Sequence, residues 1–276
     1  MKDSVRTPGG WFSSHLVLLV AFIVMLGPVL FIFLISIKTR LEALATPPSL
    51  IFTPTFENYM ELFGSAKFLH RLFNSFITAS ITTIIVLTIS VPAAYVFSRL
   101  DFRFKNVILV GILASRIIPP ISLLIPYYRF YAQLNLLDTR VGLVLVFTAF
   151  NLGLGVWTMW TFFDEIPQSL DESARIAGAS VLQVLRKILL PLAAPGLVST
   201  GIIVFTLTWN NFIFALTLTR YRSVTLPVFV TQAMAYSEID LGRLTSSALM
   251  VSLPALIFAV VARRYIQRGL LGGAFD

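Results

Sequence analysis

The chain has 276 residues, of which 57% are hydrophobic and 12% are charged. Soluble globular domains carry about 25% charged residues, so this composition excludes an ordinary soluble domain and indicates a membrane protein. The absence of cysteine excludes disulfide bonds and thiolate metal sites, and attraction to anionic lipid explains the net charge of +8 more simply than nucleic-acid binding.

Six apolar runs are long enough to cross a membrane, because a spanning helix needs about 20 residues. They are 16–37, 72–98, 107–128, 141–163, 192–219 and 244–262. Prolines within or at the ends of these runs predict kinked or broken helices. Strands of a membrane barrel would alternate polar and apolar residues, which these runs do not. We therefore predict an all-α polytopic membrane protein with six transmembrane helices, in which residues 1–276 form one transmembrane domain.

The first run is longer than the core of a signal peptide and is followed by no cleavage pattern, so we expect a retained anchor. Six spans place both termini on the same side. With the termini in the cytoplasm, the inner segments carry eleven Lys and Arg residues and the outer segments carry nine. The inner segments are then 1–15, 99–106, 164–191 and 263–276, and the outer ones 38–71, 129–140 and 220–243. Because positive charge favours the inside, we expect a multi-pass protein of the cell membrane with cytoplasmic termini.

Between the fourth and fifth runs, the segment 164–191 holds charged residues in a helical pattern. Ser169 followed by Glu172 is the spacing of a capping box and predicts a helix starting at Leu170. Gly178 stands where that helix would end, since glycine accepts the left-handed conformation that closes a helix. The residues expected on one face of this helix are Leu170, Ala174 and Ala177.

A second helix is predicted directly after the glycine. Ser180 and Gln183 repeat the capping spacing, Arg186 and Lys187 would complement the carbonyl end of the helix, and Pro191 should limit its extent. The residues expected on its apolar face are Val181, Leu185 and Ile188. Two such short helices are marginal alone in water, so they need a surface to lie on.

Several functions fit a helix–turn–helix segment in this place. Its exposed part could fit the groove of a partner protein, or the hairpin could lie on lipid alone, and Glu172 could simply cap its own helix. A DNA-reading role is disfavoured, because the segment is tethered between two spans and its second helix opens with Val181 and Leu182 rather than base-reading side chains.

The segment resembles the EAA loop of ABC-importer permeases, written E-A-A-x3-G-x9-I-x-L-P. The matching residues here are Glu172, Ser173, Ala174, Gly178, Ile188, Leu190 and Pro191. The spacing agrees throughout, and the one departure is Ser173, where the family has alanine. We refer to residues 164–191 as the coupling segment, because in that family this loop docks into a cleft on a cytoplasmic ATPase. The resemblance implies that Glu172 contacts the ATPase and that Gly178 is the turn between two coupling helices.

The similarity extends over nearly the whole chain. It includes the stretches 52–63, 72–79, 92–106, 116–128 and 208–218. They are similar to the carbohydrate branch of these permeases, most of all to the smaller, six-span subunit of the maltose-type pair. Asn211 stands where many members carry an acid, and the ending "GGAFD" departs from the family's basic ending. The resemblance implies three protein partners: a second permease subunit, a dimer of nucleotide-binding ATPase subunits and an extracytoplasmic solute-binding protein.

Catalytic chemistry is not expected in this chain. It has no phosphate-binding G-x-x-x-x-G-K-[ST] loop, and His15 and His70 are too far apart in the chain for a shared metal site, so we expect no cofactor, no metal and no enzymatic activity. The six runs contain no Asp or Glu. The alternative function, a secondary carrier or channel-like protein without an ATPase, usually needs an intramembrane acid and inverted repeats.

Five polar or aromatic residues within the runs are candidates for lining a translocation pathway. They are Arg116, Asn151, Trp209, Asn210 and Asn211. Charge at membrane depth is costly and usually functional, and Arg116 is followed by Pro119 and Pro120, so a helix break is expected beside it. For each candidate a packing role is the alternative, because amides also hydrogen-bond between helices.

Overall fold

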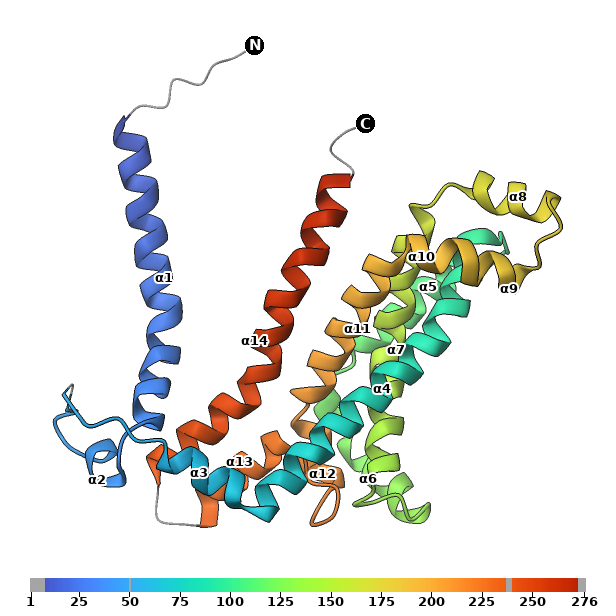
Figure 1. Ribbon diagram of the computed structural model, residues 1–276. Coiled ribbons are helices and arrows are strands. Elements are labelled where there is room, and N and C mark those ends of the chain that lie inside the picture. The colour runs from blue at the N-terminus through green and yellow to red at the C-terminus, as the bar shows by residue number, and fades with distance from the viewer. Residues whose placement is uncertain (1–7, 50, 237–239, 273–276) are drawn as a thin grey trace. The chain divides into compact units, whose positions relative to one another are not determined.

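The computed structural model describes residues 8–49, 51–236 and 240–272, and within them the chain forms helices and loops without any strand. This confirms the prediction of an all-α protein. The longer helices are α1 (Pro8–Ser36), α4 (Ala66–Arg99), α7 (Arg140–Asp164), α11 (Ala194–Trp209) and α14 (Leu241–Gly272) (Figure 1). The shorter ones are α2 (Arg40–Ala43), α3 (Glu57–Gly64), α5 (Lys105–Ala114), η1 (Ser115–Ile117), η2 (Pro120–Leu123), α6 (Leu124–Gln133), α8 (Gln168–Ile176), α9 (Val181–Val184), η3 (Leu185–Leu189), α10 (Leu190–Leu192), α12 (Ile213–Leu218) and α13 (Leu226–Tyr236).

Four helices are long and apolar enough to cross a membrane. They comprise Val17–Ser36 in α1, the whole of α4 and α7, and Leu241–Phe258 in α14. Two further stretches are pairs of helices bent at a short break, by 87° between α5 and α6 and by 78° before α11. The described chain therefore has four candidate spans, or up to six if each bent pair is one span.

The predicted run 192–219 is not one continuous helix. α11 ends at Trp209, the residues Asn210–Phe212 interrupt the helix, and α12 begins at Ile213. Sixteen residues rise by only about 24 Å, which is less than the roughly 30 Å of a hydrocarbon core. α11 alone is thus shorter than a straight span.

The chain divides into two compact units. One comprises the described residues of Met1–Ala66 and Gln232–Met250, and the other those of Lys67–Thr231 and Val251–Asp276. In the first unit, the buried side chain of Asn58 donates hydrogen bonds to the carbonyl oxygens of Ser36 and Lys38, both at 2.9 Å. These bonds tie α3 to the segment that follows α1.

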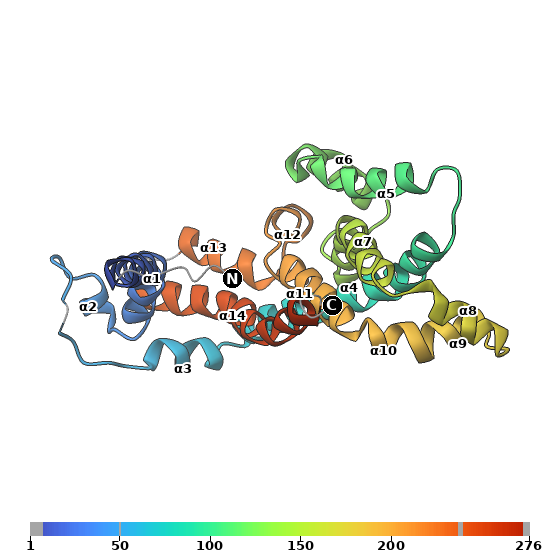
Figure 2. The ribbon, with the colours of Figure 1, turned by 90° about the horizontal axis from the view of Figure 1, so that it is seen from above.

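In the second unit, α4, α7 and α11 pack closely, with α5 and α6 on the other side of α7 (Figure 2). Small residues allow the close approach. A Cβ atom on Gly155 of α7 would lie 2.5 Å from Ser90 Oγ and 2.6 Å from Val86 of α4, and one on Gly196 of α11 would lie 2.3 Å from the ring of Phe162. The coupling segment and the segments 129–140 and 220–231 all belong to this unit.

Candidate functional site

The first helix of the coupling segment, α8, begins earlier than the sequence predicts. It starts at Gln168, with Pro167 at its N-cap (φ −55°, ψ 131°), and has no side-chain cap. Ser169 consequently lies inside the first turn, and the predicted capping box of Ser169 and Glu172 is wrong. The fixed φ of Pro167 prepares the chain for a helix without a capping side chain, a feature that the capping pattern alone does not reveal.

Gly178 forms the turn that the sequence predicts. Its φ of +86° lies in the left-handed region. The backbone N–H of Gly178 bonds to the carbonyl of Arg175 and that of Ala179 to the carbonyl of Ala174, both at 3.0 Å. This pair of bonds is a Schellman motif, which satisfies the last carbonyls of a helix. α8 therefore ends in a turn that strongly favours glycine.

The second helix of the coupling segment starts at the predicted capping box and then runs further than predicted. Ser180 and Gln183 cap each other's backbone, which confirms the prediction. The helix continues through a π-helical turn, Leu185–Leu189, to Leu192 and then bends by 78° into α11. Pro191 therefore does not end it. The wider π turn relieves the clash that a proline ring makes with the preceding turn of a regular helix.

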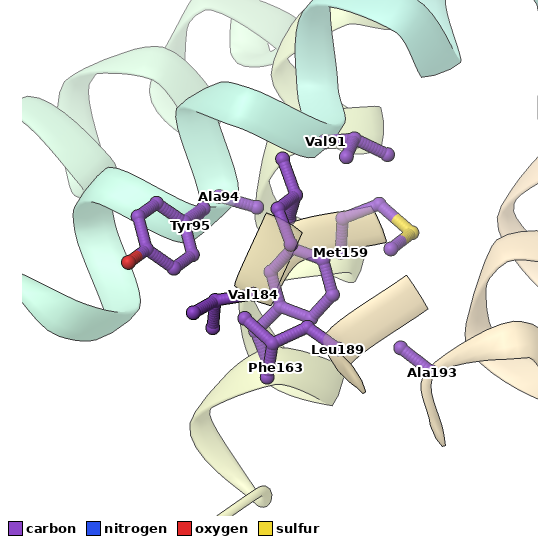
Figure 3. Packing of buried hydrophobic residues seen from close by; sticks show 9 residues of the cluster. Val91, Ala94, Tyr95, Met159, Phe163, Val184, Leu189 and Ala193 are labelled. Carbon is purple, nitrogen blue, oxygen red and sulfur yellow. The ribbon is translucent and has the colours of Figure 1, made fainter. Parts of the chain in front are cut away.

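A buried apolar cluster holds this second helix against the spans (Figure 3). The cluster consists of Val91, Ala94 and Tyr95 from α4, Met159 and Phe163 from α7, and Val184, Leu185, Leu189 and Ala193. The second helix is thus joined to the buried core of the second unit.

The apolar faces that periodicity predicts are only partly correct. Val181 is 46% exposed and Leu170 is 42% exposed, whereas Val184 and Leu189 are buried. The π turn, Leu185–Leu189, adds a residue to one turn, and so Leu189 rather than the predicted Ile188 lies on the buried face with Leu185. In α8, Ala174 packs against the cluster as predicted, but Ala177 is exposed.

α8 is fixed to the spans by an ion pair that the sequence does not suggest. Arg99, the last residue of α4, donates from Nε to Asp171 Oδ2 at 2.8 Å, and both side chains are at least nine-tenths buried. Its other two nitrogens donate to the carbonyl oxygens of Phe163 and Ile166, both at 3.0 Å. Arg99 therefore joins α4, the end of α7 and α8.

The remaining surface of the coupling segment is exposed. Glu172 and Ser173 point outward on α8, and no hydrogen bond or ion pair of the described residues involves the Glu172 side chain. Ile176 is 89% and Leu182 54% exposed. The exposed surface thus combines carboxylates, basic side chains and several apolar side chains, which is the chemistry of a helix that fits into a partner's groove.

The break predicted beside Arg116 is present. η1 ends at Ile117, Ile118 and Pro119 are not helical, and the chain turns by 87° into α6. The guanidinium of Arg116 is exposed, and among the described residues no hydrogen bond or ion pair holds it. A cation on the outside of a membrane-embedded helix is unfavourable against lipid, so its position calls for a polar surrounding.

The other four pathway candidates separate into two pairs. Asn151 is 4% exposed and donates to the carbonyl of Phe147 and to Thr208 Oγ1, and Trp209 is 3% exposed with its Nε1–H bonded to the carbonyl of Val251. These two side chains serve helix packing. The second pair, Asn210 and Asn211, occupies the break between α11 and α12. Asn210 is exposed, and Asn211 Oδ1 accepts a hydrogen bond at 3.4 Å from the backbone N–H of Phe214 in the first turn of α12.

Residues 68–271 match the family described as "Binding-protein-dependent transport system inner membrane component". The chain belongs to this family. It is 35% identical over 250 residues to the trehalose transport system permease protein SugB of Mycobacterium tuberculosis, covering 90% of this chain and 91% of that protein. It is 34% identical over 231 residues to the trehalose/maltose transport system permease protein MalG of Thermococcus litoralis, covering 82% and 83%.

A third relative is the sulfoquinovosyl glycerol transport system permease protein SmoH of Agrobacterium fabrum, 31% identical over 250 residues and covering 90% of this chain and 88% of that one. The fold matches a chain of a bacterial ABC transporter involved in the import of alginate, with a TM-score of 0.80 at 23% identity over 96% of this chain and 99% of that chain. The protein is therefore a multi-pass inner-membrane permease subunit of an ABC importer, and the alternative of a secondary carrier finds no support.

At the end of the second unit opposite the coupling segment, residues 219–225 form a hydrogen-bonded loop that the sequence did not single out (Figure 1). We call it the outer loop after its predicted side of the membrane. The carboxylate of Asp138 accepts bonds from the backbone N–H groups of Arg220, Tyr221, Arg222 and Ser223, at 2.9–3.1 Å. Burial opposes ionisation of Asp138, but these bonds outweigh it and lower its pKa from 3.8 to about 2. The ionised carboxylate holds the loop between α12 and α13 against the loop before α7.

α4 also holds the outer loop by hydrogen bonds. Asn74 donates from Nδ2 to the carbonyl oxygens of Arg222 (2.8 Å) and Val224 (3.0 Å), and Ser75 Oγ accepts from the backbone of Leu226 at 2.7 Å. Arg140 in turn donates to Asn74 Oδ1 at 2.8 Å. The bonds between α4 and this loop join residues about 150 positions apart. Sequence patterns report local structure, so they do not predict these contacts.

Proposed function

We propose that this permease subunit imports a disaccharide or a related glycoside, driven by a separate ATPase. Three relatives above 30% identity carry names of trehalose, maltose or sulfoquinovosyl glycerol transport systems. The observation that carries the coupling to an ATPase is the geometry of the coupling segment. Its two helices are joined by a left-handed glycine and packed on the spans from one side, with the other side exposed.

The ATPase would dock on the exposed side of this segment. Glu172 and Ser173 are exposed on α8, and Ala174 packs against the buried apolar cluster. Gly178 forms the turn between the two helices. The three remaining motif positions, Ile188, Leu190 and Pro191, lie in the second helix, where Leu190 packs against the buried cluster. By the family resemblance, Glu172 is the residue that contacts the ATPase, and the structure leaves it free to do so.

The other partners follow from the family resemblance and the predicted orientation. With both termini in the cytoplasm, the outer segments 38–71 and 220–243 would receive a solute-binding protein, as the family description implies. One such chain forms half of a pathway, so a second permease subunit would complete it. The long exposed face of α1, for example Met25 at 76%, would then be covered by lipid or by that subunit.

For the pathway itself we propose Arg116, Asn210 and Asn211. All three lie at breaks in apolar helices, where backbone polar groups and side chains can face a water-filled path. Amide and guanidinium groups donate hydrogen bonds to sugar hydroxyls. Asn151 and Trp209 are not included, because both are buried in the interior of the subunit.

The test is ATP-dependent uptake of radiolabelled trehalose and maltose into proteoliposomes containing the permease with its co-purified partners. The Glu172→Ala/Gly178→Pro variant should lose uptake, because proline cannot adopt a positive φ and the carboxylate contact is missing. Glu165→Ala, which removes another exposed carboxylate of the same segment, is the matched control and should retain uptake. Unchanged uptake by the double variant would contradict the coupling role and show that the segment is only a structural hairpin.

A further inference from the structure

The two helices of the coupling segment are attached to the spans in different ways. The second helix contributes several side chains to the apolar cluster with α4 and α7. α8, in contrast, has one buried residue, Asp171, and its other side chains are exposed or half-buried. A force that a partner exerts on α8 therefore reaches the spans through few contacts: Asp171, the packing of Ala174, and the chain on either side of the helix. Asp171 is the one residue among them that is both charged and buried.

The partner of Asp171 is built for a fixed orientation. The guanidinium of Arg99 is planar and holds its donors in a rigid fork, and here each of its three nitrogens has its own acceptor: Asp171, Phe163 and Ile166. Gln168 adds a weaker bond from Nε2 to the carbonyl of Ser98, at 3.4 Å. α8 can therefore hardly rotate or slide without moving the end of α4.

Stability alone does not account for this pair. Buried ion pairs are often no more stabilising than apolar residues of similar size, and Asp171 Oδ1 is buried without a hydrogen-bond partner. The nearby apolar cluster already joins α4 to the second helix. What the ion pair adds is a directional link between α8 and α4.

We propose that Arg99 is a positioning residue, which transmits the displacement of α8 to α4 during ATP-driven transport. This inference rests on the proposed function, since the displacement would come from the ATPase. α4 is a single helix from Ala66 to Arg99. Its 25 residues between Asn74 and Arg99 rise by about 37 Å, so it connects the coupling segment to the outer loop that Asn74 holds.

The first experiment measures uptake of radiolabelled trehalose or maltose per ATP hydrolysed, in proteoliposomes containing the complete importer. The variants are Arg99→Lys, which keeps the charge but loses the fork, and Arg99→Met/Asp171→Leu, which replaces the pair by apolar side chains. We expect the ratio to fall about fivefold or more for the double variant, a size typical of coupling between sites, and by less for Arg99→Lys. A merely structural role would lower uptake and hydrolysis together and leave the ratio unchanged.

Arg103→Met is the matched control, because Arg103 lies in the loop that directly follows Arg99 and has an exposed guanidinium over the ring of Phe104. It should retain the ratio of the unaltered chain. An unaltered ratio in both Arg99 variants overturns the inference. Failure of both variants to assemble also overturns it, since Arg99 would then be a folding residue. Lack of ATP-driven uptake by the unaltered chain is a different result, which contradicts the proposed function.

A second experiment needs neither substrate nor ATPase. The chain has no cysteine, so spin labels can be placed on Ile176→Cys at the end of α8 and Leu100→Cys directly after α4, both exposed. With Arg99 and Asp171 present, the distance distribution between the labels should be narrow, and in Arg99→Met/Asp171→Leu it should broaden. Equal widths in the two chains would show that Arg99 does not fix α8 and would overturn the inference.

Discussion

At the scale of single residues, backbone conformation and charge explain two turns at opposite ends of the second unit. Gly178 closes α8 with a positive φ, and Asp138, itself at φ +54°, anchors the outer loop. In both cases the residue type follows from the conformation, because the left-handed region admits glycine readily, and Asn and Asp more readily than other residues. Each turn therefore permits a substitution that separates conformation from side-chain chemistry.

Replacing Gly178 should test the strain of its conformation alone. A Cβ atom there would meet no other atom within 4 Å, so Gly178→Ala should cost about 1–2 kcal/mol, the penalty of the left-handed region, and Gly178→Asn less. Gly111→Ala is the matched control. Its Cβ would also meet nothing, but it is helical and should stabilise by up to about 1 kcal/mol. Thermal unfolding of the purified chain measures both, and equal shifts at the two sites would contradict the explanation.

Replacing Asp138 should test its charge. Because its folded pKa is lowered to about 2, the carboxylate stabilises the loop above its unfolded pKa near 4, and this stability is lost as the pH falls through about 2. Asp138→Asn tolerates the same φ but lacks the charge.

Hydrogen bonds to a charged group contribute about 1.5–3 kcal/mol, so amide exchange of residues 220–223 should rise by about tenfold or more at neutral pH in Asp138→Asn. Asp101→Asn, whose side chain is fully exposed, is the control and should leave this exchange unchanged. The same exchange rate in Asp138→Asn and the unaltered chain would exclude the carboxylate as the anchor.

At the scale of helices, short sequence motifs correctly predicted those helix ends that depend on residues close together in the chain. The capping box of Ser180 and Gln183 and the turn at Gly178 depend on residues three to five apart, and both were predictable. The start of α8 was misplaced because the proline that precedes it replaces a capping side chain. The pair of Arg99 and Asp171 joins residues 72 positions apart, which no periodicity reveals.

Close packing between α4 and α7 yields a prediction at the same scale. Gly155→Ala would place a Cβ 2.6 Å from Val86 and 2.5 Å from Ser90, so the two helices would have to separate. Overpacking of this kind costs about 1–3 kcal/mol. Gly27→Ala in α1, where a Cβ meets nothing within 4 Å, should not destabilise. Thermal unfolding of both variants provides the comparison, and tolerance of Gly155→Ala would show that α4 and α7 do not touch at this residue.

At the scale of the whole molecule, composition predicted a membrane protein, and hydropathy located the apolar stretches that could cross the membrane. The runs around 72–98 and 141–163 correspond to unbroken helices, because little in them except Pro92 opposes a helix. The runs 107–128 and 192–219 are interrupted at Ile118–Pro119 and at Asn210–Phe212. Prolines in the sequence predicted the first break. The only sequence feature at the second break is the polarity of Asn210 and Asn211, which does not by itself predict an interruption.

The orientation in the membrane remains a prediction, and two exposed positions on either side of α11 and α12 can test it. Tyr221 in the outer loop is 78% exposed and Ile176 in the coupling segment 89%. Because the chain has no cysteine, Tyr221→Cys and Ile176→Cys each introduce a unique thiol.

With cytoplasmic termini, a membrane-impermeant maleimide should label Tyr221→Cys in cells whose outer envelope alone is opened, and Ile176→Cys only after the inner membrane is permeabilised. The reverse pattern would invert the topology. It would also place the coupling segment outside the cell, where no ATP-driven partner could reach Glu172. The same labelling therefore tests both the predicted orientation and the proposed coupling role.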